Sequence, residues 1–253
     1  MTDILSWDEP AGISARGTLV VLPGRGERPG VYQRFGRRLG TDGYRVRAVG
    51  DATADLEAVT AQVKAILTGE QAPRPHVLVG SDTGALAALR AAASSSLPVD
   101  ALILAGLPDL DHVPDVDLGT WESEVEARAS CPTHRGLIAD EELLDRGALT
   151  SDRVPQELHE SIDLEAVDLP VLGLHGVDDQ ISPLVNVAPQ YARLPNARLV
   201  GIDDGRHDVL NAAVHRTVAA TVVLFLEDLK RGAGADPIAR QADLVRASAE
   251  GTP

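Results

Sequence analysis

An aspartate stands between two glycines at the point where a buried strand is predicted to turn into an Ala-rich helix. The segment VLVGSDTGA places Gly80 two residues before Asp82 and Gly84 two residues after it. That is the spacing of a nucleophile elbow, in which small flanking residues permit a sharp strand-to-helix turn. The usual nucleophile there is serine, whereas a carboxylate attacks carbon directly and leaves an alkyl or acyl ester on the enzyme. We therefore predict that Asp82 is a nucleophile.

A nucleophile at an elbow needs an acid and a base later in the chain, in that order. The sequence LHGVDDQISP follows a predicted buried strand and would present Asp179 at the carboxyl end of the sheet. The sequence DGRHD follows the last predicted strand and places His207 on a loop that can reach the elbow. We predict Asp179 as the acid and His207 as the base, with Asp178 and Asp109 as alternative acids.

In the order and spacing of its motifs, the chain resembles the α/β-hydrolase superfamily, and most closely the monoacylglycerol lipases and lysophospholipase-like proteins. Those proteins carry His-Gly-x-Gly-Glu followed by a tyrosine, Gly-x-Ser-x-Gly at the elbow, and His-Gly-x-x-Asp before a loop histidine. The matching segments here are PGRGE at 23–27 with Tyr32, GSDTG at 80–84, HGVDD at 175–179 and GRHD at 205–208. The chain departs from the pattern at Pro23, which replaces histidine, and at Asp82, which replaces serine. The second departure resembles epoxide hydrolases and haloalkane dehalogenases, whose nucleophile is aspartate.

This resemblance covers residues 17–231. It implies an α/β-hydrolase fold with a mostly parallel central sheet, helices on both faces and a small helical cap. It also implies that the backbone N–H groups of Arg25 and Thr83 are oxyanion donors, and that His175 has a structural place beneath a turn. Ser81 would be the nucleophile only if the elbow began one residue earlier, which loses the symmetry of the flanking glycines.

Strands and helices alternate along the chain, which independently predicts a mostly parallel sheet with helices on both faces. Strands are predicted at residues 4–7, 18–22, 44–49, 76–79, 101–105, 171–174 and 197–202. Helices are predicted at residues 31–39, 55–67, 83–93 and 209–230. The pattern assigns residues 1–108 and 169–231 to the core domain. Residues 232–253 form a C-terminal tail whose composition fits a loose helix.

Residues 109–168 interrupt the alternation over a length that is uncommon for a structureless loop in a compact domain. A helical pattern near residues 121–129 and a charged composition predict an inserted cap that covers the elbow and moves. Its least surface-like side chains, Trp121, Cys131 and His134, are candidate substrate contacts. A packed thiol and a surface imidazole are the alternative interpretation of Cys131 and His134, and Trp121 could equally belong to the cap's own core.

The chain of 253 residues has a formal net charge of −15 and a single cysteine. An acidic surface argues against nucleic acids and anionic membranes as partners, because like charges repel. One cysteine allows no internal disulfide, and the first residues lack the pattern of a signal peptide, so we expect a cytoplasmic protein. No apolar run reaches the roughly 18 residues needed to span a bilayer. We expect a small-molecule substrate and neither cofactor nor metal, since Cys131 and His134 have no second cysteine pair to complete a zinc site.

These observations predict a hydrolase that acts through an aspartyl-ester intermediate on a small epoxide, lactone or ester. Dehalogenases of this type have tryptophan after the nucleophile, where this chain has Thr83. Epoxide hydrolases present two tyrosines from the cap, whereas all three tyrosines of this chain lie outside residues 109–168, so His134 or Cys131 would have to serve as the acid. The alternative is a non-hydrolytic protein of the same fold, an isomerase, cyclase or binding protein, in which Asp82 is a base or inert.

Overall fold

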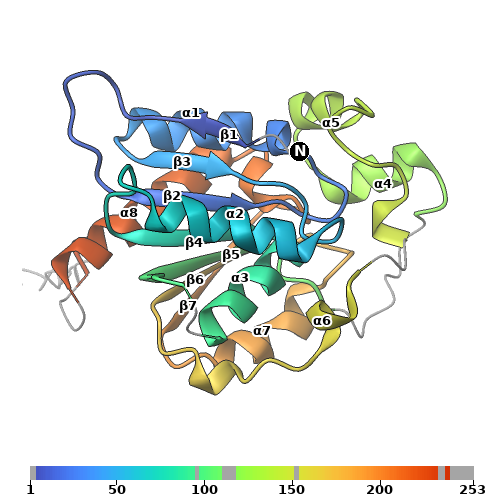
Figure 1. Cartoon of the computed structure of the whole chain (residues 1–253). Helices are drawn as coiled ribbons and strands as arrows, with labels where there is room; N and C mark the ends of the chain where they lie inside the picture. The colour runs from blue at the N-terminus through green and yellow to red at the C-terminus, as the bar shows by residue number, and fades with distance from the viewer. Residues whose placement is uncertain (1–3, 95–96, 110–117, 151–153, 233–236, 240–253) are drawn as a thin grey trace, which may run out of the picture.

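The computed structural model describes residues 4–94, 97–109, 118–150, 154–232 and 237–239 (Figure 1). The described residues form a seven-stranded sheet in the order β1-β3-β2-β4-β5-β6-β7. Every neighbouring pair is parallel except β1 with β3, which is antiparallel. The strands are β1 (Leu5–Trp7), β2 (Thr18–Leu22), β3 (Arg45–Ala48), β4 (His76–Ser81), β5 (Ala101–Ala105), β6 (Val171–Gly176) and β7 (Ala197–Ile202).

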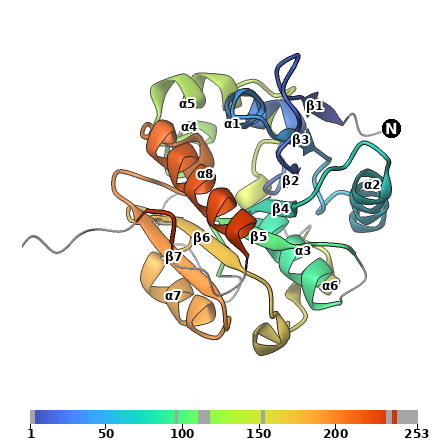
Figure 2. The same cartoon turned by 90° about the vertical axis from the view of Figure 1, so that its left-hand side faces the viewer.

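Helices cover both faces of this sheet (Figure 2). Successive side chains of a strand point to opposite faces, so Leu19 of β2 packs into one core cluster and Val20 into the other. The first face is covered by α1 (Gln33–Thr41) and α8 (His215–Arg231). The second face is covered by α2 (Leu56–Thr68), α3 (Thr83–Ala93) and α7 (Leu184–Ala192). Burial on both faces explains why the central strands read as continuous apolar runs.

The α/β architecture predicted from the sequence is confirmed, and the bounds of α3, β5 and β7 agree with the prediction. The predicted helix at 209–230 is wrong in one respect, because it divides into a 3-10 helix, η4 (Val209–Asn211), and α8. Ala212 adopts an extended backbone between them, with ψ of 164°. Helix α7, which follows Pro183, was not predicted. The prediction of a loose helix in the tail falls largely outside the described residues.

The predicted cap has two structurally different parts. Helices α4 (Trp121–Arg128) and α5 (Pro132–Ile138) lie beyond the edge to which the parallel strands point (Figure 1). The later helices, α6 (Gln156–His159) and the 3-10 helix η3 (Leu164–Ala166), pack against α3 instead. Their Leu158 and Leu164 belong to the core cluster of the second sheet face. The part that projects over the sheet edge is therefore shorter than residues 109–168, and residues 110–117 and 151–153 lie outside the described residues.

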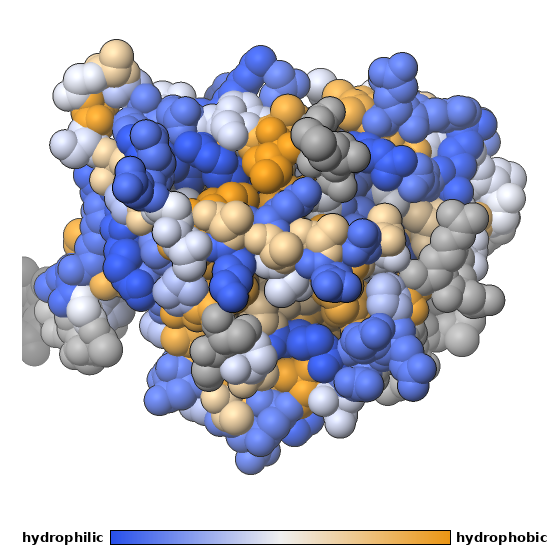
Figure 3. Space-filling model, viewed as in Figure 1, coloured by the Kyte–Doolittle hydropathy of each residue, from blue (hydrophilic) through white to orange (hydrophobic). Residues whose placement is uncertain are grey.

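The face seen in Figure 1 is largely hydrophilic, with a small hydrophobic patch near its upper middle (Figure 3). Large apolar side chains that are exposed occur at separate places along the described chain, at Ile4, Leu5, Ile13, Val177, Val185, Leu224 and Ile238. In the described ranges, no helix combines the length and the apolar composition that a membrane span requires.

Candidate active site

The turn after β4 holds Asp82 in a backbone conformation that few side chains adopt. Asp82 has φ of 48° and ψ of −123°, a positive φ that is uncommon outside glycine and costs free energy. The flanking glycines are required by close contacts. A Cβ at Gly84 would lie 2.1 Å from the carbonyl oxygen of Leu22, and one at Gly80 would lie 2.4 Å from the Cα of Ala85. Glycine at both positions therefore permits the elbow turn that carries Asp82.

The structure brings Asp82, Asp179 and His207 together at the carboxyl ends of the strands. The Nε2 atom of His207 lies 3.2 Å from Oδ1 of Asp82. On the other side of the ring, Nδ1 lies 2.9 Å from Oδ2 of Asp179. The second oxygen of Asp179 accepts hydrogen bonds from the backbone N–H groups of Ile181 at 2.9 Å and Ser182 at 3.0 Å. These bonds fix the acid so that it orients the imidazole toward the elbow.

The residues predicted as alternative acids have other surroundings in the structure. Asp178 is exposed, and the backbone N–H of Asp109 donates to the Ser182 hydroxyl at 3.1 Å. His175 is fully buried, and its Nε2 contacts the carbonyl oxygen of Ser182 at 2.6 Å and Oδ2 of Asp179 at 3.2 Å. It therefore lies beneath the turn that carries Asp179, which is the structural place implied by the resemblance.

Arg25, on the loop after β2, contacts Asp82 through both its backbone and its side chain. Its backbone N–H donates to Oδ2 of Asp82 at 3.0 Å. Its guanidinium donates from Nε to Oδ2 and from Nη2 to Oδ1, each at 2.7 Å. The sequence motif predicts Arg25 only as a backbone donor and does not indicate this bidentate ion pair. Thr83, the other predicted donor, is the first residue of α3, and its buried hydroxyl has no hydrogen-bond partner in the structure.

Asp82, Asp179, His207 and Arg25 form what we call the elbow cluster, and their charges shift one another's pKa values. Burial alone would raise the pKa of Asp82, but the guanidinium of Arg25 and the ring of His207 hold it well below its usual range. Burial disfavours a charged His207, yet the two carboxylates outweigh it and raise its pKa to about 10. The two carboxylates therefore favour the protonated form of His207.

A second group of buried charges lies under helix α4, and we call it the cap cluster: Arg128, Glu124, Glu27, Asp208 and His134. All five residues are at most 3% exposed. The guanidinium of Arg128 lies 3.1 Å from Glu124, 3.6 Å from Glu27 and 3.9 Å from Asp208. His134 of α5 contacts the other oxygen of Asp208 at 3.3 Å. One guanidinium thus faces three carboxylates from three separate segments.

Arg128 links the cap to both loops of the elbow cluster. Its Nη2 donates to the carbonyl oxygen of Arg25 at 3.1 Å, and its own carbonyl oxygen accepts the N–H of Asp208 at 2.8 Å. Asp208 directly follows His207. Burial and the nearby charge of Asp208 raise the pKa of Glu27 to about 8, and the Tyr32 hydroxyl donates to this carboxyl. Helix α4 is therefore tied to the active-site loops by buried polar contacts, contrary to the loosely packed cover expected from its composition.

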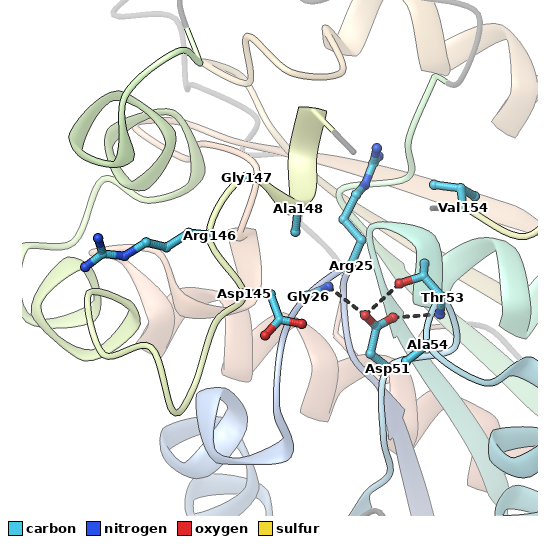
Figure 4. Close-up of a pocket in the computed structure, with 10 residues that line it drawn as sticks. All are labelled: Arg25, Gly26, Asp51, Thr53, Ala54, Asp145, Arg146, Gly147, Ala148 and Val154. Carbon is cyan, nitrogen blue, oxygen red and sulfur yellow. Dashed lines mark hydrogen bonds between the residues drawn. The ribbon is translucent and has the colours of Figure 1, made fainter. Parts of the chain in front are cut away.

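A cavity of about 190 Å³ lies beside Arg25 (Figure 4). It is lined by Arg25, Gly26, Asp51, Thr53, Ala54, Asp145, Arg146, Gly147, Ala148 and Val154. Asp51 forms part of the cavity wall. Its two carboxylate oxygens accept hydrogen bonds from the Gly26 N–H and from the N–H and hydroxyl of Thr53. The 3-10 helix η2 (Ala148–Thr150), within the predicted cap, contributes Ala148 to the cavity lining.

The three cap residues predicted to touch substrate do not line this cavity. Cys131 is buried, with its sulfur 3.5 Å from Arg34, and His134 is in the cap cluster. Trp121 packs against the core and lies under the guanidinium of Arg146, 5.2 Å from the ring centre. The stretch Asp145–Ala148 reaches the cavity instead, and composition gave no signal for it. Among the residues that the structure describes, no group of three His, Cys, Asp or Glu side chains is placed to hold a metal ion.

No protein-family model matches the chain, and no curated protein matches it in sequence. Solved structures do match it. A soluble variant of monoglyceride lipase from Saccharomyces cerevisiae, in complex with a substrate analogue, aligns over 89% of this chain and 91% of its own, with a TM-score of 0.69 and 16% identity. The chain has the α/β-hydrolase fold.

Two further structures with the α/β-hydrolase fold give the same result. The monoacylglycerol lipase of Paleococcus ferrophilus aligns over 88% of this chain and 98% of its own, with a TM-score of 0.67 and 16% identity. An esterase from Exiguobacterium antarcticum aligns over 88% and 94%, with a TM-score of 0.66 and 16% identity. At such identities the likeness concerns the fold, and the chemistry has to be argued from the site itself.

Proposed function

We propose that the chain is a hydrolase that acts on a small epoxide, lactone or ester through an ester of Asp82. The orientation of the Asp82 carboxylate carries this proposal. Oδ2 lies on the backbone N–H of Arg25, and Oδ1 faces Nε2 of His207. One oxygen thus has the place of an oxyanion and the other that of a nucleophile. Lipases and an esterase share the fold, which supports hydrolysis as the class of reaction.

In the first step, Oδ1 of Asp82 bonds to the electrophilic carbon, the carbon–oxygen bond of the substrate breaks, and the released oxygen takes up a proton. A saturated carbon, as in an epoxide, gives an ester of Asp82, whereas the acyl carbon of an ester or lactone gives a mixed anhydride. In the second step, water attacks Cγ of Asp82 while His207 accepts its proton. The negative charge that develops on Oδ2 is stabilised by the Arg25 N–H. A single donor of this kind is typically worth about 2.7–4 kcal/mol in the transition state. The Cγ–Oδ1 bond then breaks, so the former Oδ1 leaves in the product with the proton returned by His207, and the water oxygen stays in the Asp82 carboxylate.

The change in charge on Asp82 adapts His207 to the second step. Before reaction the two carboxylates keep His207 protonated, with its pKa at about 10. Ester formation removes the charge of Asp82, so the pKa of His207 falls while its bond to Asp179 remains. The proton that His207 then loses balances the one taken up by the released oxygen. The imidazole becomes a base only after the ester has formed.

A single turnover in heavy-oxygen water tests this mechanism. Water attacks Cγ of Asp82, so one labelled oxygen enters the Asp82 carboxylate before any labelled product appears. A panel of styrene oxide, β-butyrolactone and p-nitrophenyl butyrate is used as substrate, and the peptide containing Asp82 is analysed by mass spectrometry. Turnover of styrene oxide with label only in the product would exclude the ester.

The second candidate function is non-hydrolytic, with Asp82 as a base or without a chemical role. The observation that favours it is the ion pair with Arg25, which occupies both oxygens of Asp82. A base or an inert residue never acquires a label from water under turnover. The same isotope experiment therefore separates the two functions.

A further inference from the structure

The guanidinium of Arg25 blocks the attack that the proposed function requires. Nη2 of Arg25 lies 2.7 Å from Oδ1 of Asp82, the oxygen that faces His207. Nε takes the other oxygen at the same distance. Carbon cannot approach Oδ1 along the direction that Nη2 occupies, so the guanidinium has to move when substrate binds.

Ester formation would also remove the partner of Arg25. Its side chain is 12% exposed and that of Asp82 is 2% exposed, so this is a buried pair. An ester of Asp82 carries no charge, and a buried guanidinium left without an anion is strongly destabilised. Asp51, another carboxylate of the cavity, already accepts three hydrogen bonds, from Gly26 and Thr53.

The other carboxylate that lines the cavity is paired too. Asp145 accepts hydrogen bonds from the guanidinium of Arg28 at 2.8 Å and 3.3 Å. Arg146, the second arginine of the lining, is bound to Glu141 at 2.7 Å and lies over Trp121. Of the two arginines that line the cavity, Arg25 is therefore the one whose partner, the Asp82 carboxylate, would lose its charge in the reaction. Figure 4 shows its side chain extending between Ala148 and Val154, which line the same cavity.

We propose that the substrate carries a carboxylate that takes over the guanidinium of Arg25 and thereby frees Asp82. A guanidinium binds a carboxylate through two parallel hydrogen bonds, so the exchange replaces one fork with an equivalent one. The cavity of about 190 Å³ has the volume of about six water molecules, which suits a short acid. The inference rests on the proposed function and narrows its substrates to anionic epoxides, lactones or esters.

The binding test uses butyrate, with butyramide as the neutral match, and calorimetry as the readout. Asp82 competes with an added anion for Arg25, so Asp82→Asn is expected to tighten butyrate binding by about tenfold or more. Arg25→Gln in the same background is expected to abolish it, whereas Arg38→Gln, which removes an exposed arginine of α1, leaves it unchanged. Butyramide should show no such pattern. The proposal is overturned if Asp82→Asn binds butyrate equally well with and without the Arg25→Gln change. It is also overturned if the expected changes in affinity occur with inorganic phosphate but not with butyrate.

The turnover test compares p-nitrophenyl hemisuccinate with p-nitrophenyl butyrate, which differ mainly in one negative charge. The wild-type protein is expected to favour the hemisuccinate in kcat/KM by about tenfold, and Arg25→Gln to reverse this preference. A wild-type preference for the neutral ester overturns the proposal. If Asp82 is labelled in heavy-oxygen water but the protein does not prefer the anionic ester, the proposed function stands and only the preference for anionic substrates is rejected. Anion binding at Arg25 without label on Asp82 would reject the ester mechanism alone.

Discussion

Two groups of buried charged residues lie next to each other in this molecule. They differ in whether they reach a cavity wall and in how far apart their residues are in the sequence. The elbow cluster is built from short motifs at strand ends, and its Arg25 forms part of a cavity wall. The cap cluster comes from three distant segments, and each of its residues is at most 3% exposed. Asp82, Asp179 and His207 are also at most 4% exposed, so Arg25 is the residue through which the elbow cluster meets the cavity. The charges of the cap cluster pair across separate segments and fix α4 to the loops of the elbow cluster.

The largest effect is expected within the elbow cluster. Asp82→Asn removes the proposed nucleophile and should lower turnover by about 10⁴-fold or more. His207→Gln should instead allow the covalent ester to accumulate, because His207 acts only in its hydrolysis. Intact-mass measurement after mixing with substrate shows the ester directly. If Asp82→Asn had wild-type activity, the elbow cluster would have no chemical role, and the two clusters would not differ in function.

The next effect distinguishes two adjacent carboxylates. Asp179→Asn is expected to reduce kcat by about 10⁴-fold, because the bond that orients His207 is lost. Asp178→Asn is the matched control, since Asp178 is exposed and one residue away. Steady-state kinetics on both variants provide the measurement. Similar losses in the two variants would mean that the acid has been assigned to the wrong residue.

Within the cap cluster, stability rather than turnover should change first. Arg128→Met keeps much of the side-chain volume but leaves the buried carboxylates of Glu124 and Asp208 without this cation, which we expect to cost about 3–5 kcal/mol of unfolding free energy. Arg135→Met, at a partly exposed arginine of α5, is the control. Chemical denaturation measures both. A stable Arg128→Met protein with greatly reduced kcat would instead place Arg128 in the chemistry.

Glu27 allows a smaller, pH-dependent test of the cap cluster. Its folded-state pKa of about 8 lies above the ordinary value of 4.5. The folded chain keeps this proton while the unfolded chain releases it, so stability falls as the pH rises from about 4.5 to about 8. Glu27→Gln should remove this loss, and its stability relative to wild type should rise by about 1 kcal/mol per pH unit in that window. Unfolding between pH 5 and pH 8 measures it, with the exposed Glu57→Gln as control; a flat difference would contradict it.

The smallest effect compares two residues of the predicted cap. Val154 lines the cavity, so Val154→Ala should change the preference among substrates of different size by about tenfold. Cys131 is packed away from that cavity, so Cys131→Ala should leave the preference unchanged and cost about 1 kcal/mol of stability. Relative kcat/KM values over the ester panel provide the measurement. A change of preference in Cys131→Ala would restore its earlier assignment as a substrate contact.

The sequence by itself predicted the α/β architecture, the elbow and the order of its three groups. These features depend on short-range rules. A buried strand needs an apolar run. A glycine is required where nearby backbone lies within 2.5 Å of its missing Cβ, as at Gly80, which meets the Cα of Ala85. The acid and base follow strands that end at the same edge, so their proximity to Asp82 comes from the parallel sheet.

Only the tertiary structure decided how the charged side chains pair. Glu124 and Arg128 are four residues apart, a spacing that in sequence indicates an ordinary exposed helix pair. In the fold they are buried with Glu27, which lies about a hundred positions earlier. Likewise, nothing within the motif of Arg25 indicates that its side chain binds Asp82, 57 positions later. Local patterns record burial and backbone geometry, whereas the partner of a long, flexible charged side chain is set by which distant segments the fold brings within its reach.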